Sequence, residues 1–256
     1  MLFKCRNELR PGIMLPIKIV CTADPELIND VIRSTNRQTQ VLDEAFESLK
    51  EFHKQLQDYY NTYATKDHLY YERRTHEYDN GDKPVKKSNI ITLPIQLMAM
   101  LSMFLEEPHS VHRYYGELLK AYRQRLFQSD HKLTAYYTSA WALHRIEDSL
   151  RRGQLDMKYR RFRYHMLFMI QVCIRHLANF KDMPRPNSHD MEKLCDKIRL
   201  ALSDNKQLDA LLRLFTKVID EVVKGMNVHQ RLSTNEIVRR KEFTSLLENK
   251  CRSIKL

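Results

Sequence analysis

Two clusters of amide, guanidinium and phenol side chains flank one amphipathic stretch, residues 42–60. The first cluster occupies residues 33–40 and the second occupies residues 69–74. Guanidinium groups bind phosphate or base edges through paired hydrogen bonds, amides read base edges, and phenol rings stack on bases. The residue types therefore predict a nucleic-acid contact in which Tyr70 and Tyr71 stack on bases. The predicted contacts to phosphates or base edges are made by Asn36, Arg37, Gln38, Arg73 and Arg74.

Both clusters also have a plain structural interpretation. Glu72 could hold Arg73 or Arg74 in an internal ion pair, and the amides of residues 36–40 could cap a loop. The residue types leave these alternatives open.

A third basic segment covers residues 145–163, and Tyr159, Phe162 and the adjoining Tyr164 alternate with its arginines and a lysine. Basic groups with aromatic faces hold single strands by charge and stacking. The alternative is a solvated helix face with its aromatic rings in the core. Under the binding interpretation, four residues add affinity that depends on salt and not on sequence: Arg151, Arg152, Arg160 and Arg161.

The charge of the chain is uneven. Residues 1–90 carry 14 basic and 14 acidic side chains, whereas residues 91–256 carry 29 basic and 18 acidic ones, a net of 29 − 18 = +11. A basic surface of this kind attracts phosphate backbones or acidic partners. The second part of the chain is therefore the expected source of non-specific affinity.

No stretch carries a recognisable catalytic or metal-binding pattern. There is no glycine-rich phosphate loop, no G-x-S-x-G, no H-E-x-x-H and no EF-hand. Glu106, His109 and His112 form the best metal candidate, but Pro108 interrupts their helical spacing and favours a simple helix end. The sequence thus predicts no catalytic residue, no metal ligand and no cofactor.

Composition places the chain among helical proteins of the cytoplasm. Only 5 glycines and 8 prolines occur, which favours long helices. The 5 cysteines are widely spaced without C-x-x-C, which argues against disulfides and structural zinc. No apolar run has the roughly 18 residues of a membrane span, so we expect no membrane partner.

Hydrophobic periodicity predicts a mainly α fold, with a small incomplete α/β segment followed by a multi-helix bundle or array. The expected domains are residues 1–90 and 91–256. Residues 13–21 and 89–93 are the predicted strands, and residues 71–88 the clearest loop. After helices that begin at residues 24 and 42, the predicted helices are 95–105, 111–127, 132–152, 157–180, 189–202, 205–226 and 235–253.

The order of these features resembles the AIPR family, the abortive-infection phage resistance proteins of bacteria. It comprises the apolar strand 17–21, an Asp-Pro-Glu helix start, residues 34–41, a Phe-containing helix and residues 69–74. The resemblance extends over residues 15–110 and more weakly to about residue 150. The resemblance implies functional positions of the family at Asn36, Gln38, Tyr70, Tyr71, Glu72, Arg73 and Arg74.

The resemblance implies a bacterial defence protein. Family members look like longer chains, with a nuclease-like region and an Asn-Gly-x-Gln-Thr element ahead of the strand at residues 17–21. Neither is found here, so we expect a truncated C-terminal portion, or one piece of a split protein, that lacks the nuclease activity.

We therefore expect a non-catalytic module that contacts DNA or RNA. Charge reversal at Arg73 and Arg74 should then weaken binding more than reversal at Arg239 and Arg240. The alternative is a helical interaction module that docks a separate nuclease or sensor subunit through an exposed apolar patch in residues 13–20 or 90–97. A complete nuclease is a third interpretation, which metal-dependent cleavage would support.

Overall fold

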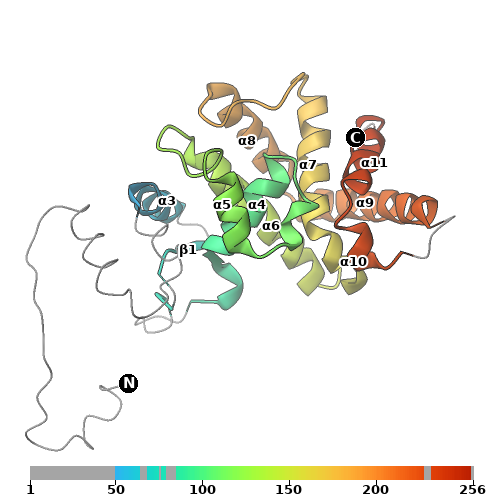
Figure 1. The fold of residues 1–256 in the computed structure, drawn as a ribbon, viewed down its shortest axis with the longest axis horizontal. Helices are drawn as coiled ribbons and strands as arrows, with labels where there is room; N and C mark the ends of the chain where they lie inside the picture. The colour runs from blue at the N-terminus through green and yellow to red at the C-terminus, as the bar shows by residue number, and fades with distance from the viewer. Residues whose placement is uncertain (1–49, 64–67, 75, 79–84, 228–231, 255–256) are drawn as a thin grey trace, which may run out of the picture. The chain divides into compact units, whose positions relative to one another are not determined.

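A computed structural model describes residues 50–63, 68–74, 76–78, 85–227 and 232–254 (Figure 1). All of them belong to one compact unit, Leu42–Leu256. The predicted strand at residues 13–21, the helix start at Asp24 and the cluster Asn36, Arg37 and Gln38 lie outside the described residues.

The prediction of a mainly α fold with a small α/β part is confirmed. Short 3-10 turns η1 (Lys87–Asn89), η2 (Ser110–His112) and η3 (Met157–Phe162) separate some of the longer elements. In chain order, the helices and strands are α3 (Glu51–Asn61), β1 (Tyr70–Glu72), β2 (Ile90–Thr92), α4 (Leu93–Met103), α5 (Tyr115–Tyr122), α6 (Leu133–Arg151), α7 (Arg163–Leu177), α8 (His189–Ala201), α9 (Asn205–Met226), α10 (Thr234–Ile237) and α11 (Lys241–Arg252).

Strands β1 and β2 pair in parallel, with Tyr71 opposite Ile91. The predicted strand at residues 89–93 is therefore confirmed, whereas the loop predicted for residues 71–88 is wrong at its start. The strand forms there because the Tyr71 side chain has a buried place in the core. Strand β2 continues directly into α4, and the domain boundary at residue 90 stays a prediction.

Helix α4 forms the centre of the core, as its nearly continuous apolar sequence predicts. It contacts α6 and α7 along its length, and also α5, β2 and η2. Leu97, Ala99, Met100 and Leu101 have no exposed surface. A helix that is apolar all round needs such neighbours on every side.

Three predicted helices are interrupted in the structure. Residues 111–127 contain the end of η2 and then α5, residues 157–180 form η3 followed by α7, and residues 235–253 break between α10 and α11. Arg240 has extended backbone angles at the last break. Apolar residues keep their helical spacing across these turns, so the sequence pattern does not reveal them.

Within the described ranges, no helix combines the length and the apolar character that crossing a membrane requires.

Candidate nucleic-acid interface

The Tyr71 side chain lies in the core beneath β1. Its ring has 0% exposure, and its hydroxyl lies 2.7 Å from Nδ1 of the equally buried His53. The Tyr60 ring packs beside it at 5.6 Å between ring centroids. The stacking role predicted for Tyr71 does not fit this position, because a base would have to displace the core.

The other side chains of this motif lie nearer the surface. The Tyr70 ring is half-buried, with the rings of His68 and Tyr78 edge-on at 4.3 and 5.3 Å. Arg73 donates from Nε to Gln57 Oε1 at 3.4 Å. Arg74 is exposed, so this motif offers one outward guanidinium and one that is engaged by its neighbours.

A carboxylate shapes the turn that follows β1. Glu77 Oε2 accepts hydrogen bonds from the backbone N–H groups of Arg73 and Arg74, each at 3.2 Å. Glu77, which the sequence interpretation does not include, is therefore an acid that binds this turn. The bonds fix where the two arginine side chains leave the backbone.

Arg152 belongs to an internal network that joins α6 to α9. Its guanidinium donates to Asp209 at 3.1 and 3.2 Å and to Asp148 at 2.8 Å, and Ser149 donates to Asp209 at 2.5 Å. Burial raises the pKa of the Asp209 carboxyl, but the hydrogen bonds from Arg152 and Ser149 outweigh it and lower the pKa overall. Both Arg152 and Arg151 are exposed, but Arg152 is held by these bonds to two carboxylates, whereas Arg151 has only Asp148, at 3.4 Å.

The aromatic residues in the segment 145–163, and Tyr164 directly after it, belong to the core. Tyr159, Phe162 and Tyr164 are 8%, 7% and 4% exposed, and Tyr159 donates to Asp220 at 2.6 Å. Their rings are therefore not presented to a nucleic acid. The exposed groups of this segment include Arg160, which lies 3.7 Å from Glu147, and Arg161, which donates to Asn235.

Arg161 is part of a larger basic surface assembled from separate segments. Arg161, Arg163 and Arg239 lie close enough to His112 for their charges to act on its ring. At His109 the charges of Lys241 and Arg113 act in the same way, alongside the opposing charge of Glu107. Four of the five are exposed, and Arg163 is half-buried beside Glu147 at 3.1 Å. We call these five residues the η2 basic patch: Arg113, Arg161, Arg163, Arg239 and Lys241.

Neutral histidines lie beneath this patch. Burial, followed by the charges of Arg239, Arg163 and Arg161, lowers the pKa of His112 to about 4. His165 is fully buried at 4.9 Å from the Phe243 ring, and neither ring nitrogen has a hydrogen-bond partner among the described residues. Burial lowers its pKa to about 3, with smaller effects from His112 and His109. A buried, uncharged ring such as that of His165 screens nearby surface cations less than water does, which strengthens their field.

Glu106 and His109, two members of the best metal candidate of the sequence, have other partners in the structure. Glu106 pairs with Arg175 at 2.9 Å, and His109 lies 3.1 Å from Glu107. The described part of the chain contains no group of three or more His, Cys, Asp or Glu side chains placed to hold a metal ion.

Sequence reasoning missed Arg113, Arg239 and Lys241, and also Tyr114. The Tyr114 side chain is 52% exposed and directly follows Arg113, so the basic surface has an accessible aromatic neighbour. Only the packing of η2, η3 and the turn between α10 and α11 brings these residues together. No spacing within the sequence carries that information.

The fold and this surface define a helical protein with a basic patch built over a buried histidine layer. A model of the AIPR family, described as AIPR protein, matches residues 4–255, and the chain therefore belongs to this family. The match confirms the resemblance and extends it beyond residue 150 to the last helices. The family indicates a bacterial abortive-infection protein that acts against phage. Comparisons with curated proteins and with solved structures found no match.

Proposed function

We propose that this AIPR chain contacts nucleic acid through the η2 basic patch. The observation that carries the proposal is the convergence of five cations from separate segments around His109 and His112. Within the described residues, no carboxylate forms an ion pair with Arg113, Arg239 or Lys241. Unpaired cations are the groups that release counterions from a phosphate backbone on binding.

The patch suits binding that depends little on sequence. Its arginines and lysine contact phosphates, and the exposed Tyr114 ring stacks on a base, as aromatic side chains do in single-strand binding proteins. Arg160 lies beside the patch in the chain and adds to its charge.

The Tyr70–Arg74 motif supplies a second, smaller contact in this proposal. Arg74 faces solvent, and the half-buried Tyr70 offers one edge of its ring. The predicted contacts of Asn36, Arg37 and Gln38 remain part of the proposal, although these residues lie outside the described ranges. Tyr71 and Arg152 act instead by positioning their neighbours.

The proposal assigns no cleavage chemistry to this chain, and one experiment scores both activities. Labelled single- and double-stranded DNA and RNA are titrated with purified protein across a salt series, with and without Mg²⁺. We expect binding whose logarithm falls steeply with the logarithm of salt concentration, without cleavage. Absence of binding at low salt by a folded, monodisperse sample would refute the proposal, and Mg²⁺-dependent cleavage would refute its non-catalytic part.

The rival function is the docking of a nuclease or sensor subunit, and part of one of its two predicted surfaces is buried. Ile91, Leu93 and Leu97 are 4%, 7% and 0% exposed, since they pack into the core. In this range Ile90, Pro94 and Ile95 stay half-buried, so less apolar surface is left here for a partner than the sequence suggests. The other predicted surface, residues 13–20, lies outside the described ranges.

A further inference from the structure

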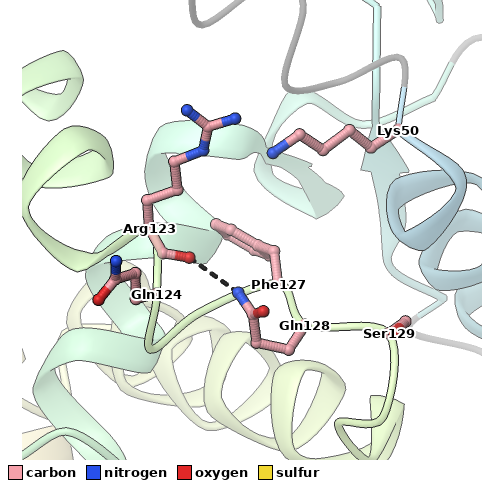
Figure 2. A pocket seen from close by; sticks show the side chains of 6 residues that line it. All are labelled: Lys50, Arg123, Gln124, Phe127, Gln128 and Ser129. Atoms are coloured by element: carbon pink, nitrogen blue, oxygen red, sulfur yellow. Dashed lines mark hydrogen bonds between the residues drawn. The ribbon is translucent and has the colours of Figure 1, made fainter. Parts of the chain in front are cut away.

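A cavity of about 420 Å³ lies at the loop between α5 and α6. The described residues that line it are Lys50, which directly precedes α3, and Arg123, Gln124, Phe127, Gln128 and Ser129 from the loop (Figure 2). Its volume falls within the range of small-molecule sites, roughly 300–1,000 Å³. It shares no residue with the η2 basic patch.

The backbone of this loop is strained and firmly held. Phe127 has a φ of 55°, a left-handed conformation that is unfavourable for a bulky side chain. Its N–H donates to the hydroxyl of the fully buried Tyr136 at 2.6 Å, and His131 Nδ1 lies 2.8 Å from the same hydroxyl. Such a conformation persists where its surroundings determine it, as at many ligand sites.

Further hydrogen bonds brace the loop on both sides of Phe127. Gln128 donates from Nε2 to the carbonyl oxygens of Arg123 at 2.8 Å and Leu126 at 2.7 Å. Beyond the cavity, Asn187 donates to Asp130 at 2.7 Å, and the Lys132 N–H donates to the carbonyl of Pro186 at 2.9 Å. The cavity is therefore formed before any ligand arrives, which lowers the entropic cost of binding.

Among the described residues, the lining combines positive charge with hydrogen-bonding groups and includes no carboxylate. Figure 2 shows the Lys50 ammonium and the Arg123 guanidinium extending toward each other over the opening, with the Phe127 ring and the Gln128 amide below them. An arginine fork matches the geometry of phosphate oxygens, and a lysine ammonium adds a point charge.

We propose that this cavity binds a phosphate monoester of nucleotide size. Arg123 and Lys50 hold the phosphate, and the amides of Gln124 and Gln128 with the Ser129 hydroxyl bind the remainder of the ligand. The monoester is either a free mononucleotide or the 5′ end of a strand, which present the same chemistry. The site is separate from the η2 basic patch, so either proposal can fail without the other.

Calorimetric titration of the full chain tests the site with inorganic phosphate, adenosine and uridine 5′-monophosphates, and adenosine without phosphate. We expect both monophosphates to bind at least tenfold more tightly than adenosine. Arg123→Gln should weaken monophosphate binding at least tenfold. Arg125→Gln is the matched control, because Arg125 is an exposed arginine two residues away that does not line the cavity.

A second variant tests the braced loop without changing charge. Gln128→Ala removes the hydrogen bonds to Arg123 and Leu126, and we expect weaker monophosphate binding from a folded chain. Equal binding of adenosine and its monophosphate, equal losses in Arg123→Gln and Arg125→Gln, or no binding of monophosphate at millimolar concentration would each overturn the proposal.

Oligonucleotides with a 5′-phosphate or a 5′-hydroxyl distinguish the two sources of the monoester. They are titrated into a chain that carries Arg161→Glu and Arg239→Glu, which disable the η2 basic patch. A tenfold preference for the 5′-phosphate, lost in Arg123→Gln, assigns the site to strand ends. If the free mononucleotide binds but the 5′-phosphate has no effect, the site is assigned to free nucleotides.

Discussion

The Tyr70–Arg74 motif and the η2 basic patch differ in how the fold uses their polar side chains. In the motif, adjacent residues divide between the core and the surface: Tyr71 binds His53 inside, while Arg74 faces solvent. In the patch, exposed cations from distant segments share one surface around His109 and His112. A compact sequence motif can therefore offer fewer binding groups than a surface that no sequence motif marks.

The layers beneath the two regions differ as well. Under the motif, His53 has the Tyr71 hydroxyl as a partner at 2.7 Å. Under the patch, neither nitrogen of His165 has a hydrogen-bond partner among the described residues. His53 is therefore held by a hydrogen bond. His165 stays neutral in the folded protein, because protonation would place a charge in the core.

The largest effect is expected from reversing charge in the patch. Arg161→Glu with Arg239→Glu should weaken binding to single-stranded nucleic acid by roughly 100-fold at low salt and flatten the salt dependence, because two phosphate contacts become repulsive. Titration by fluorescence anisotropy measures this. The matched control, Lys206→Glu with Lys217→Glu on α9, changes the net charge equally at exposed positions outside the patch. If it loses as much affinity, the effect comes from net charge alone.

The two histidines below the patch, His165 and His112, should make the free energy of unfolding depend on pH. The pKa of His165 is about 3 and that of His112 about 4 in the folded chain, against about 6.5 when unfolded. Unfolding takes up protons below pH 6.5, so the free energy of unfolding falls as pH drops from 6.5 toward 4. The slope is at most about 1.4 kcal/mol per pH unit for each histidine.

His165→Leu should make this decline shallower, since it removes one of the two titrating rings without breaking a hydrogen bond. Urea denaturation at several pH values between 4 and 7 provides the measurement. A variant with the same slope as the unmodified chain would show that His165 is not held neutral by the fold.

Beneath the motif, Tyr71→Phe should cost about 1 kcal/mol of stability, because it removes the hydroxyl that binds His53 Nδ1. Nucleic-acid affinity per folded molecule should stay unchanged. Urea denaturation and anisotropy titration of the same sample give the two values. Loss of affinity without loss of stability would restore the stacking role predicted for Tyr71.

The smallest effect is expected at the motif surface. Arg73→Glu with Arg74→Glu should weaken binding only about threefold, close to the loss of one exposed phosphate contact. This reverses the expectation from sequence, which placed the larger loss here and used Arg239 and Arg240 as the reference pair. Arg239 lies in the patch beside His112, so it is not a neutral reference. A loss at Arg73 and Arg74 greater than at the patch would favour the sequence-based prediction.

Local signals in the sequence predicted much of the helical fold. The predicted helices 132–152, 189–202 and 205–226 agree with α6, α8 and α9 to within a residue at each end. The start of α8 was readable because Ser188 accepts a hydrogen bond from the Met191 N–H, a cap that depends on neighbouring residues.

The features that sequence reasoning missed depend on long-range packing. The breaks at η2, η3 and between α10 and α11 leave the apolar periodicity intact, and β1 gains its partner β2 only through the fold. The η2 basic patch forms at those breaks. Its residues were visible as positive charge in the second part of the chain, but their convergence requires three-dimensional information.

Photo-crosslinking of a bound strand, followed by mass spectrometry of the peptides, most directly locates the nucleic acid. Each region has a tyrosine near the surface: Tyr114 directly follows Arg113 of the patch, and Tyr70 belongs to the motif. We predict that the main adduct lies on the peptide containing Tyr114, and that it disappears in the chain carrying Arg161→Glu and Arg239→Glu. A main adduct at Tyr70, unaffected by those changes, would contradict the assignment of binding to the η2 basic patch.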